Sequence, residues 1–264
     1  MINANIFNPD MKIEFFNSPY HHVIVSNFLK EGVFRDIKEK LPKWDDFPDK
    51  VQRGGRKDLS NFHYGNFGSI NSHFKNNHNL ESLYLSMSSE LFRKFCLDHF
   101  QVKDNKSNPN LKLPITFDIC IARDSYINIP HVDGDYHLVS GLFYFGNEKI
   151  KSGGNILLHK NPSDSLFKKN YRDKDIEKVV IEKKIPPVGN TLVFWLNSPD
   201  SIHSTDNLIG ERNFLYFSID SEKTPALPRP WSSIKSQFKA ISGVRRNIKP
   251  SIFKRFNDIL NSSN

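Results

Sequence analysis

The sequence predicts a mainly β protein of the α+β class, in which helices near the N-terminus precede a β-sandwich or jelly roll. Short apolar segments punctuated by glycine and proline follow one another between residues 111 and 222, and this spacing favours antiparallel strands over a parallel α/β sheet. Apolar residues form 38% of the 264-residue chain and include 22 Phe, so a hydrophobic core is available and a fully disordered chain is excluded.

The N-terminal part is predicted to contain one strand and two helices. Residues 20–29 alternate and then become continuously apolar, as in a strand that leads into a turn. Residues 30–41 place apolar side chains at helical spacing, and Pro42 ends that helix. Residues 43–79 are rich in Gly, Asn, Asp and His and are expected to be irregular, whereas residues 80–100 repeat apolar side chains every three or four positions and predict a single amphipathic helix.

From Leu111 onward the sequence predicts seven strands separated by turns. Glycine and proline mark the turns, notably at Gly153-Gly154 and from Pro186 to Gly189. The strands are expected near residues 113–123, 138–145, 154–159, 177–185, 190–196, 200–204 and 212–220.

The length fits one large domain with an appended tail better than two domains. We expect residues 1–222 to form this domain, with an N-terminal support over residues 1–110 and a jelly-roll core over residues 111–222. Three prolines just after residue 222 mark a break, and residues 223–264 are predicted to form a basic amphipathic helical tail.

The composition further predicts a soluble, cytoplasmic protein. No apolar run approaches the roughly 20 residues that span a bilayer, and the N-terminus lacks the basic and continuous apolar regions of a secretory signal. The two cysteines, Cys96 and Cys120, cannot form a disulfide framework and have no zinc-finger spacing, as expected for a reducing compartment.

The net charge of the chain lies in the predicted tail. From Lys223 to the C-terminus there are nine basic residues and one acidic residue, which accounts for the whole net charge of +8. A basic body that binds nucleic acid is therefore not supported. Residues 231–248 place large apolar side chains on one helical face and basic ones opposite. We interpret the tail as a helix packed on the domain, as a peripheral contact to an anionic membrane, or as a docking patch for an acidic partner.

His131 and Asp133 form the first candidate for a chemical site. Residues i and i+2 of an extended segment point to the same side, so this imidazole and this carboxylate could converge on one metal ion. Taken alone, a His-x-Asp spacing is more often structural than functional. Asp135 is a rival carboxylate, but at position i+4 it shares the face only if the strand continues through Gly134.

The motifs that follow His131 give this pair its significance. Gly153-Gly154 introduces an apolar strand, the turn from Pro186 to Gly189 introduces another, and His203 and Arg212 come after them. Two histidines and one carboxylate form the facial triad of non-heme Fe(II) oxygenases. A nearby arginine, with its planar fork of donors, suits the distal carboxylate of a bound dicarboxylic acid.

In this order of motifs, residues 113–220 resemble the Fe(II)- and 2-oxoglutarate-dependent dioxygenases, in particular the prolyl 4-hydroxylase-like branch. The family pattern is His-x-Asp, Gly-Gly before a strand, Pro-x-x-Gly before another strand, and then a distal His followed about ten residues later by Arg or Lys. It falls here on His131, Asp133, Gly153-Gly154, Pro186 to Gly189, His203 and Arg212. The predicted strand and helix over residues 20–41 also look like the lead-in of this family.

The resemblance implies a double-stranded β-helix, a jelly roll that carries iron at its open end. It implies that His131, Asp133 and His203 bind Fe(II), that 2-oxoglutarate chelates this metal, that Arg212 pairs with the far carboxylate, and that O2 takes the remaining position. The implied reaction hydroxylates an unactivated C–H bond and yields succinate and CO2. Relatives that halogenate replace the carboxylate ligand, so Asp133 favours hydroxylation.

The sequence departs from the family next to the arginine. Many relatives carry Ser two residues later, as a second contact to the distal carboxylate, and this chain has Phe214 there. The contact must then come from elsewhere, and Tyr126 and Tyr144 are the candidates. The signature of the nucleic-acid demethylase branch is not met after Arg212, so nucleic acid is not expected as a substrate.

A small molecule or a peptide is the expected substrate: a peptide or amino acid or, if the tail contacts a membrane, an envelope saccharide precursor. Residues 50–68 are interpreted either as a surface excursion or as a cover that offers Arg53, Arg56 or Tyr64 to an acidic or polar substrate. Trp195 is expected in the core. The alternatives to an enzyme are a non-catalytic, metal-binding jelly-roll interaction module and a nucleic-acid-binding module.

Overall fold

The structure, a computed structural model, describes residues 6–48, 55–61, 68–100, 115–133, 137–146, 148–160 and 179–220. Its helices are α1 (Glu31–Glu39), α2 (Asn71–Phe74), α3 (His78–Met87) and α4 (Glu90–Asp98), with a short 3₁₀ helix at Trp44–Asp46. Its strands are β1 (Lys12–Phe16), β2 (His22–Ser26), β3 (Arg56–Ser60), β4 (Gly68–Ser69), β5 (Ile115–Ala122), β6 (Asn128–His131), β7 (His137–Tyr144), β8 (Ile150–Ser152), β9 (Ile156–Lys160), β10 (Val180–Ile185), β11 (Thr191–Leu196), β12 (His203–Thr205), β13 (Ile209–Gly210) and β14 (Arg212–Asp220).

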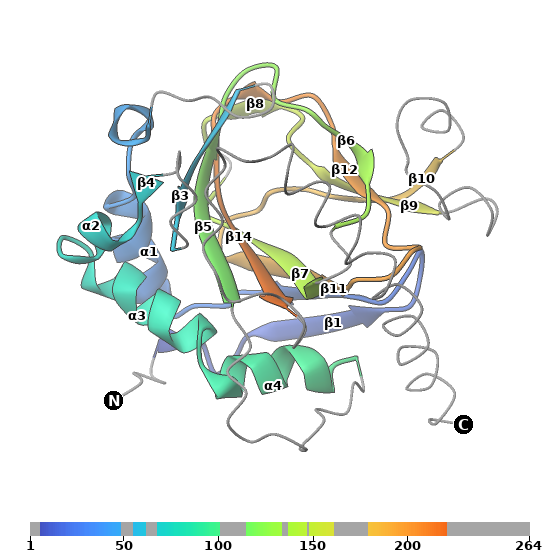
Figure 1. Cartoon of the computed structure of the whole chain (residues 1–264), viewed down its shortest axis with the longest axis horizontal. Coiled ribbons are helices and arrows are strands. Elements are labelled where there is room, and N and C mark those ends of the chain that lie inside the picture. The colour runs from blue at the N-terminus through green and yellow to red at the C-terminus, as the bar shows by residue number, and fades with distance from the viewer. Residues whose placement is uncertain are drawn as a thin grey trace, which may run out of the picture.

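Two mainly antiparallel sheets carry the fold. The large sheet has the strand order β1-β2-β11-β7-β14-β5-β3-β4, and the small sheet has the order β10-β9-β12-β6. β13 and β8 form a separate pair. Figure 1 shows the helices gathered along one side of the large sheet and the strands of the small sheet on the other side.

The alternation of side chains along the central strands divides the interior into two cores. On β14, Leu215 and Phe217 belong to the core under the helices, where they join residues such as Phe92 of α4. Phe214 and Tyr216 of the same strand face the small sheet. The central strands of the large sheet are therefore buried on both faces, and the face with Phe214 and Tyr216 is the one that can contribute residues to a site between the two sheets.

The predicted helix over residues 80–100 is wrong in one respect, because two helices occupy this region. Ser89 has extended backbone angles and its hydroxyl accepts a hydrogen bond from the backbone N–H of Phe92 at 3.2 Å, so it caps a new helix. Asn77 caps α3 in the same way through the N–H of Leu80. The apolar period continues across the break, which is why the periodicity alone predicted one helix.

The prediction that residues 43–79 are irregular is also wrong in part. β3 pairs antiparallel with β5 and extends the large sheet, β4 pairs parallel with β3, and α2 follows. The sequence of β3, Arg-Lys-Asp-Leu-Ser, has one apolar residue and gives no hydrophobic signal. Its side chains are nevertheless buried or half-buried, because they face polar partners on β5 and near the 3₁₀ helix.

The other predicted elements have counterparts in the described residues. α1 and β2 lie within the predicted ranges 30–41 and 20–29, and the seven strands predicted after Leu111 match β5, β7, β9, β10, β11, β12 and β14 to within a few residues. The edge strands β1 and β6 and the short strands β8 and β13 were not predicted. The tail over residues 223–264 lies outside the described residues, and no described helix has the length and apolar character needed to cross a membrane.

Asn190, in the turn before β11, ties this turn to the segment after β2. Its φ of 58° lies in the left-handed region, which Asn tolerates better than most residues. Its buried side chain accepts a hydrogen bond from the backbone N–H of Leu29 and donates one to the carbonyl oxygen of Leu29, each at 2.8 Å. The side chain thus adds two hydrogen bonds to the backbone bond that the Phe28 N–H donates to the Asn190 carbonyl oxygen at 3.1 Å.

We expect Asn190→Ala to lower the free energy of unfolding by about 3 kcal/mol, since it removes two buried hydrogen bonds and places Cβ in a left-handed backbone without a compensating side chain. Asn190→Gly removes the same bonds but relaxes the backbone, so it should cost less. Urea unfolding of the two variants measures both effects. A value for Asn190→Ala that equals the wild type would show that the corner does not depend on this side chain.

Candidate metal centre

Strand pairing brings His131 and His203 together. β6 pairs antiparallel with β12, and His131 stands directly opposite His203 in this register. The two imidazole rings have centroids 4.3 Å apart. Two histidines separated by 72 positions in the sequence are therefore neighbours because of the small sheet.

Asp133 completes the group two residues beyond the end of the β6 pairing. Its Oδ1 lies 3.7 Å from Nε2 of His131, and its Oδ2 lies 3.7 Å from Nε2 of His203. Two donors that are each about 2.1 Å from one ion are at most about 4.2 Å apart, so these separations suit a shared metal. Among the described His, Cys, Asp and Glu residues this is the group whose donor atoms, all within 4.8 Å of one another, could hold an ion.

The hydrogen bonds behind the histidines orient the nitrogen atoms for a metal. Nδ1 of His131 is 2.8 Å from the carbonyl oxygen of Ile129, and Nδ1 of His203 is 3.0 Å from that of Ser201. A carbonyl oxygen only accepts, so each Nδ1 carries a proton, and Nε2 is the nitrogen of each ring that can bind a metal. Backbone acceptors of this kind commonly fix the tautomer of metal-binding histidines.

The electrostatics of Asp133 also fit a cation. Burial alone raises the pKa of its carboxyl group, but the nearby imidazoles of His203 and His131 outweigh burial and hold the pKa below its ordinary value. Its Oδ2 is buried and has no hydrogen-bond partner among the described residues. An ionised, buried carboxylate oxygen without a donor is an acceptor for a metal ion.

Arg212, the first residue of β14, lies in the same cavity as the three donors. The side chain is 1% exposed, and no described carboxylate forms an ion pair with it. One terminal nitrogen donates to the carbonyl oxygen of Gly154, and Nε has no partner. A buried guanidinium that lacks an anion is costly unless a ligand supplies one.

The glycine pair predicted from the sequence has a clear role beside Arg212. Gly153 and Gly154 both have φ of 70°, and a Cβ on Gly153 would meet the backbone oxygen of Asn207 at 1.8 Å. Only glycine fits this approach. The resulting turn points the Gly154 carbonyl at Arg212, so the motif positions the cation.

Both tyrosine candidates lie against the guanidinium. Its carbon is 5.5 Å from the ring centroid of Tyr126 and 5.9 Å from that of Tyr144, and 4.4 Å from the ring of Phe214. Burial raises the pKa of Tyr144 to about 12, so its hydroxyl remains a donor. That hydroxyl is buried and has no partner among the described residues, which makes Tyr144 the better placed of the two.

A cavity of about 190 Å³ joins these groups. Trp195 forms part of its wall, with its indole 4.5 Å from the His203 ring between centroids, so the side chain predicted to be core also shapes the site. Asn128 and Thr205 line the cavity from the paired strands β6 and β12. Polar atoms from the small sheet and from the large sheet thus face one space.

Arg56 also lines this cavity, from β3. Its Nε donates to Oδ1 of Asp58 at 2.6 Å, and this ion pair outweighs burial and raises the pKa of Arg56 above its ordinary value. Its charge is thus matched within the protein rather than reserved for an acidic substrate. Arg53, Tyr64 and the rival ligand Asp135 lie outside the described residues.

Asp118 of β5 is a cavity residue that the sequence analysis missed. A signal was present, because the segment from Ile115 to Ala122 alternates large apolar residues with Thr, Asp, Cys and Ala. This alternation marks a second, more polar face on a strand that otherwise looked like a plain core strand.

Comparison with solved structures identifies the fold. The chain resembles a Trichoplax adhaerens prolyl hydroxylase in complex with a hypoxia inducible factor peptide fragment, with a TM-score of 0.50 and 16% identity over 76% of this chain and 84% of that one. It also matches a prolyl 4-hydroxylase from Phytophthora capsici (TM-score 0.49, 16% identity, 85% and 68% covered) and a 2OG-Fe(II) oxygenase family protein from Burkholderia pseudomallei (0.48, 13%, 79% and 88%). No protein-family model and no curated protein matches the sequence.

The first of these likenesses shows that the chain has the jelly-roll fold of the prolyl 4-hydroxylase-like oxygenases. The predicted fold class, mainly β with N-terminal supporting helices, is confirmed, and so is the resemblance at the level of the fold. At 16% identity, what the protein does must be argued from its own residues.

The triad is expected to bind divalent transition metals through all three side chains. Structural zinc sites with four ligands bind with about 10–16 kcal/mol, so the loss of one ligand should cost about 3 kcal/mol, or about 100-fold in affinity. Titration of Co(II), followed by its visible absorption, should show this loss for His203→Ala and for Asp133→Asn. His78→Ala, which removes an exposed histidine elsewhere, is the matched control. Equal affinities in all the proteins would contradict the site.

Proposed function

We propose that the protein is an Fe(II)- and 2-oxoglutarate-dependent dioxygenase that hydroxylates an unactivated C–H bond of its substrate and produces succinate and CO2. In this proposal His131, Asp133 and His203 hold Fe(II), and residues 1–222 form the catalytic domain. Fe(II) would supply the activation of O2, coupled to the decarboxylation of 2-oxoglutarate.

The observation that carries the proposal is that one cavity contains both a set of metal donors with open positions and a buried arginine without an anion. The triad offers two imidazoles and one carboxylate, a donor set that leaves positions open on an octahedral metal. Arg212 offers an unmatched, buried positive charge in the same cavity. A dicarboxylic acid satisfies both requirements at once, since one end can chelate the metal while the other meets the guanidinium.

The chain's own residues would bind and orient this co-substrate. Arg212 would donate to the distal carboxylate, and the hydroxyl of Tyr144 would add the contact that Ser provides in many relatives, with Tyr126 as the second candidate. Phe214 would close the apolar side of this pocket, where its ring already packs on the guanidinium. Trp195 and the buried strands around it would exclude water from the reacting atoms.

The metal and 2-oxoglutarate can be tested without a known substrate. Anaerobic Fe(II) and 2-oxoglutarate should give a weak visible charge-transfer band in the wild type, and this band should be absent in His131→Ala and bleached by oxygen with formation of succinate. Folding is checked by circular dichroism. A folded, metal-loaded protein without the band would overturn the proposal and favour a non-catalytic jelly-roll module.

The residues expected around the distal carboxylate of 2-oxoglutarate should differ in their effect on its binding. Arg212→Leu should weaken 2-oxoglutarate binding by about 100-fold or more, because it removes a charge-assisted contact, and Tyr144→Phe should weaken it by about tenfold. Tyr126→Phe should have less effect, since the free buried hydroxyl belongs to Tyr144. Isothermal titration with Zn(II) in place of iron measures all three. A larger effect for Tyr126→Phe than for Tyr144→Phe would reverse the assignment of the two tyrosines.

Peripheral membrane contact through residues 223–264, and with it an envelope saccharide precursor as substrate, remains a prediction from the tail sequence. Its basis is the amphipathic pattern of residues 231–248. The full chain should bind anionic vesicles in sedimentation, and a chain that lacks residues 231–264 should not. Undiminished binding by the shortened chain would refute the role of the tail. No binding by the full chain would refute membrane contact and leave a peptide, an amino acid or another soluble molecule as the substrate.

A further inference from the structure

The cavity of the metal centre extends over the inner face of the large sheet toward β3. There β5 lies between β14 and β3, and Asp118 stands opposite Tyr216 on one side and Ser60 on the other. Asp118, Tyr216 and Arg56 line the cavity together with the metal donors. This floor is the part of the cavity that the triad, Arg212 and Tyr144 do not occupy, so it is where a substrate would lie.

The basic side chains at and beside this floor, Arg56 and His137, already have acidic partners. Arg56 is paired with Asp58, and its guanidinium carbon lies 5.6 Å from the Phe214 ring centroid. His137 is hydrogen-bonded to Asp220, which also accepts from the hydroxyl of Ser218 at 2.9 Å. Each of these two side chains is therefore bonded to a carboxylate other than that of Asp118.

Asp118 is left as an acidic group without a cation of its own. Its Oδ1 is buried and has no hydrogen-bond partner among the described residues. Burial raises its pKa to about 7, the charge of Asp58 adds to this, and the Ser60 hydroxyl, Arg56 and His137 act in the opposite direction without restoring the ordinary value. A buried carboxylate oxygen that faces a cavity without a donor calls for a ligand that brings one.

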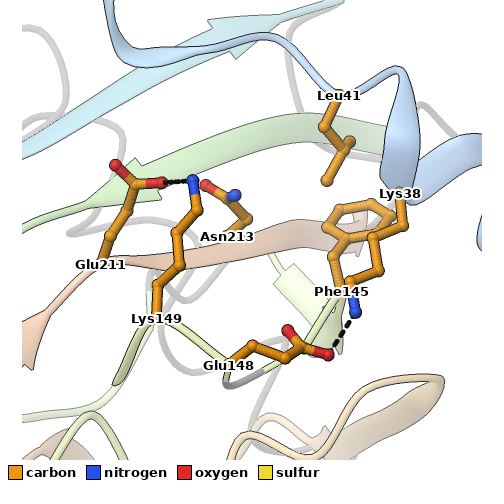
Figure 2. Close-up of a pocket in the computed structure, with 8 residues that line it drawn as sticks. Lys38, Leu41, Phe145, Glu148, Lys149, Glu211 and Asn213 are labelled. Atoms are coloured by element: carbon orange, nitrogen blue, oxygen red, sulfur yellow. Dashed lines mark hydrogen bonds and ion pairs between the residues drawn. The ribbon is translucent and has the colours of Figure 1, made fainter. Parts of the chain in front are cut away.

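A second hollow of the described structure provides a contrast. It has a volume of about 250 Å³ and lies between α1 and the β7–β8 region (Figure 2). Each charged side chain that lines it is paired: Lys38 with Glu148, and Lys149 with Glu211 at 2.7 Å. Glu211 also pairs with Arg123. That hollow therefore presents no unmet charge, whereas the floor of the metal cavity does.

We propose that Asp118 is a specificity-determining residue that binds a cationic nitrogen of the substrate, a protonated amine or a guanidinium. This inference rests on the proposed function, because it assigns the substrate side of the same cavity. A cation at Asp118 supplies the missing donor to Oδ1 and stabilises the charged carboxylate. The carbon atoms attached to that nitrogen then lie in the cavity shared with the triad, where a C–H bond can be presented to the metal.

The substrate charge that this floor favours is positive, whereas Arg56 in the sequence suggested a negatively charged substrate. An isolated Arg56 would favour an acidic substrate, but Asp58 neutralises it at 2.6 Å. With Arg56 and Asp58 matched, and His137 bonded to Asp220, the remaining acidic group of the floor is Asp118. The floor therefore selects a positive group and disfavours a negative one.

The experiment compares three small probes of matched length: n-pentylammonium, 1-pentanol and pentanoate. The full chain is loaded with Zn(II) and saturated with 2-oxoglutarate, so that no turnover occurs and the Arg212 pocket is filled. Affinities are measured by saturation-transfer NMR titration. The wild type should bind pentylammonium about tenfold more tightly than pentanol, and pentanoate more weakly than either.

Asp118→Asn keeps the size of the side chain and removes its charge, so the preference for ammonium over alcohol should disappear. Asp10→Asn makes the same charge change at an exposed site far along the chain from the cavity strands and should preserve the preference. A wild type that binds pentanol as well as pentylammonium refutes the inference even if the Asp118 variant does not fold. Preferred binding of pentanoate that is lost in Arg56→Gln would refute it in favour of an acidic substrate.

The affinity of the wild type for 2-oxoglutarate, measured in the same samples, distinguishes a failure of the proposed function from a failure of the Asp118 assignment. If Zn(II)-loaded wild type does not bind 2-oxoglutarate, the proposed function fails whatever the probes do. If it binds 2-oxoglutarate but shows no ammonium preference, only the assignment of Asp118 fails.

Discussion

The register of β14 between β5 and β7 is the constraint on which both the core and the candidate site depend. Leu215 and Phe217 point into the core under the helices, and Arg212 and Phe214 point into the cavity. Because strand side chains alternate, a slip of one residue would exchange these sets and place a guanidinium among phenylalanines. Each large apolar side chain contributes about 1.5–3 kcal/mol of burial, so the hydrophobic face of the strand fixes where its polar face lies.

The small sheet imposes a second, weaker constraint on the same cavity. It carries both histidines, and His131 belongs to a four-residue edge strand whose register with β12 shifts between residues 203 and 205. The histidines are then held individually by backbone carbonyl oxygens. Several buried polar atoms without partners gather here, including Asp133 Oδ2, Tyr144 Oη, Arg212 Nε and Trp195 Nε1. At about 1–3 kcal/mol each, such atoms are rare in native proteins unless a ligand meets them.

The sequence predicted those parts of the fold and site that follow from the periodicity of apolar residues, from the glycines and prolines that end elements, and from the order of the motifs. The strands with continuous or alternating apolar residues were predicted correctly, because a strand that is buried on one or both faces needs apolar side chains that are visible in the sequence. β3 was missed because its five residues pack through charge pairing, as in Arg56 and Asp58, and a propensity argument does not detect that. The break at Ser89 was missed because a capping serine and an exposed helix serine look alike until the backbone angles are known.

The candidate site shows the same limit. The order of His131, Asp133, His203 and Arg212 was sufficient to group them, although only the pairing of β6 with β12 explains why they meet. Asp118 could not be singled out, since its significance lies in the partners that its neighbours already have. Charge matching of this kind is a property of three-dimensional neighbours rather than of spacing.

The residues of the candidate site come from both sheets, and this has a mechanical consequence. The two metal-binding histidines come from the small sheet and Asp133 from the segment that follows it, whereas Arg212 and Tyr144 come from the large sheet. A co-substrate held at both ends would act as a cross-link between the layers of the sandwich. In the proposed function, the two sheets would therefore be held together more firmly with the co-substrate bound than without it.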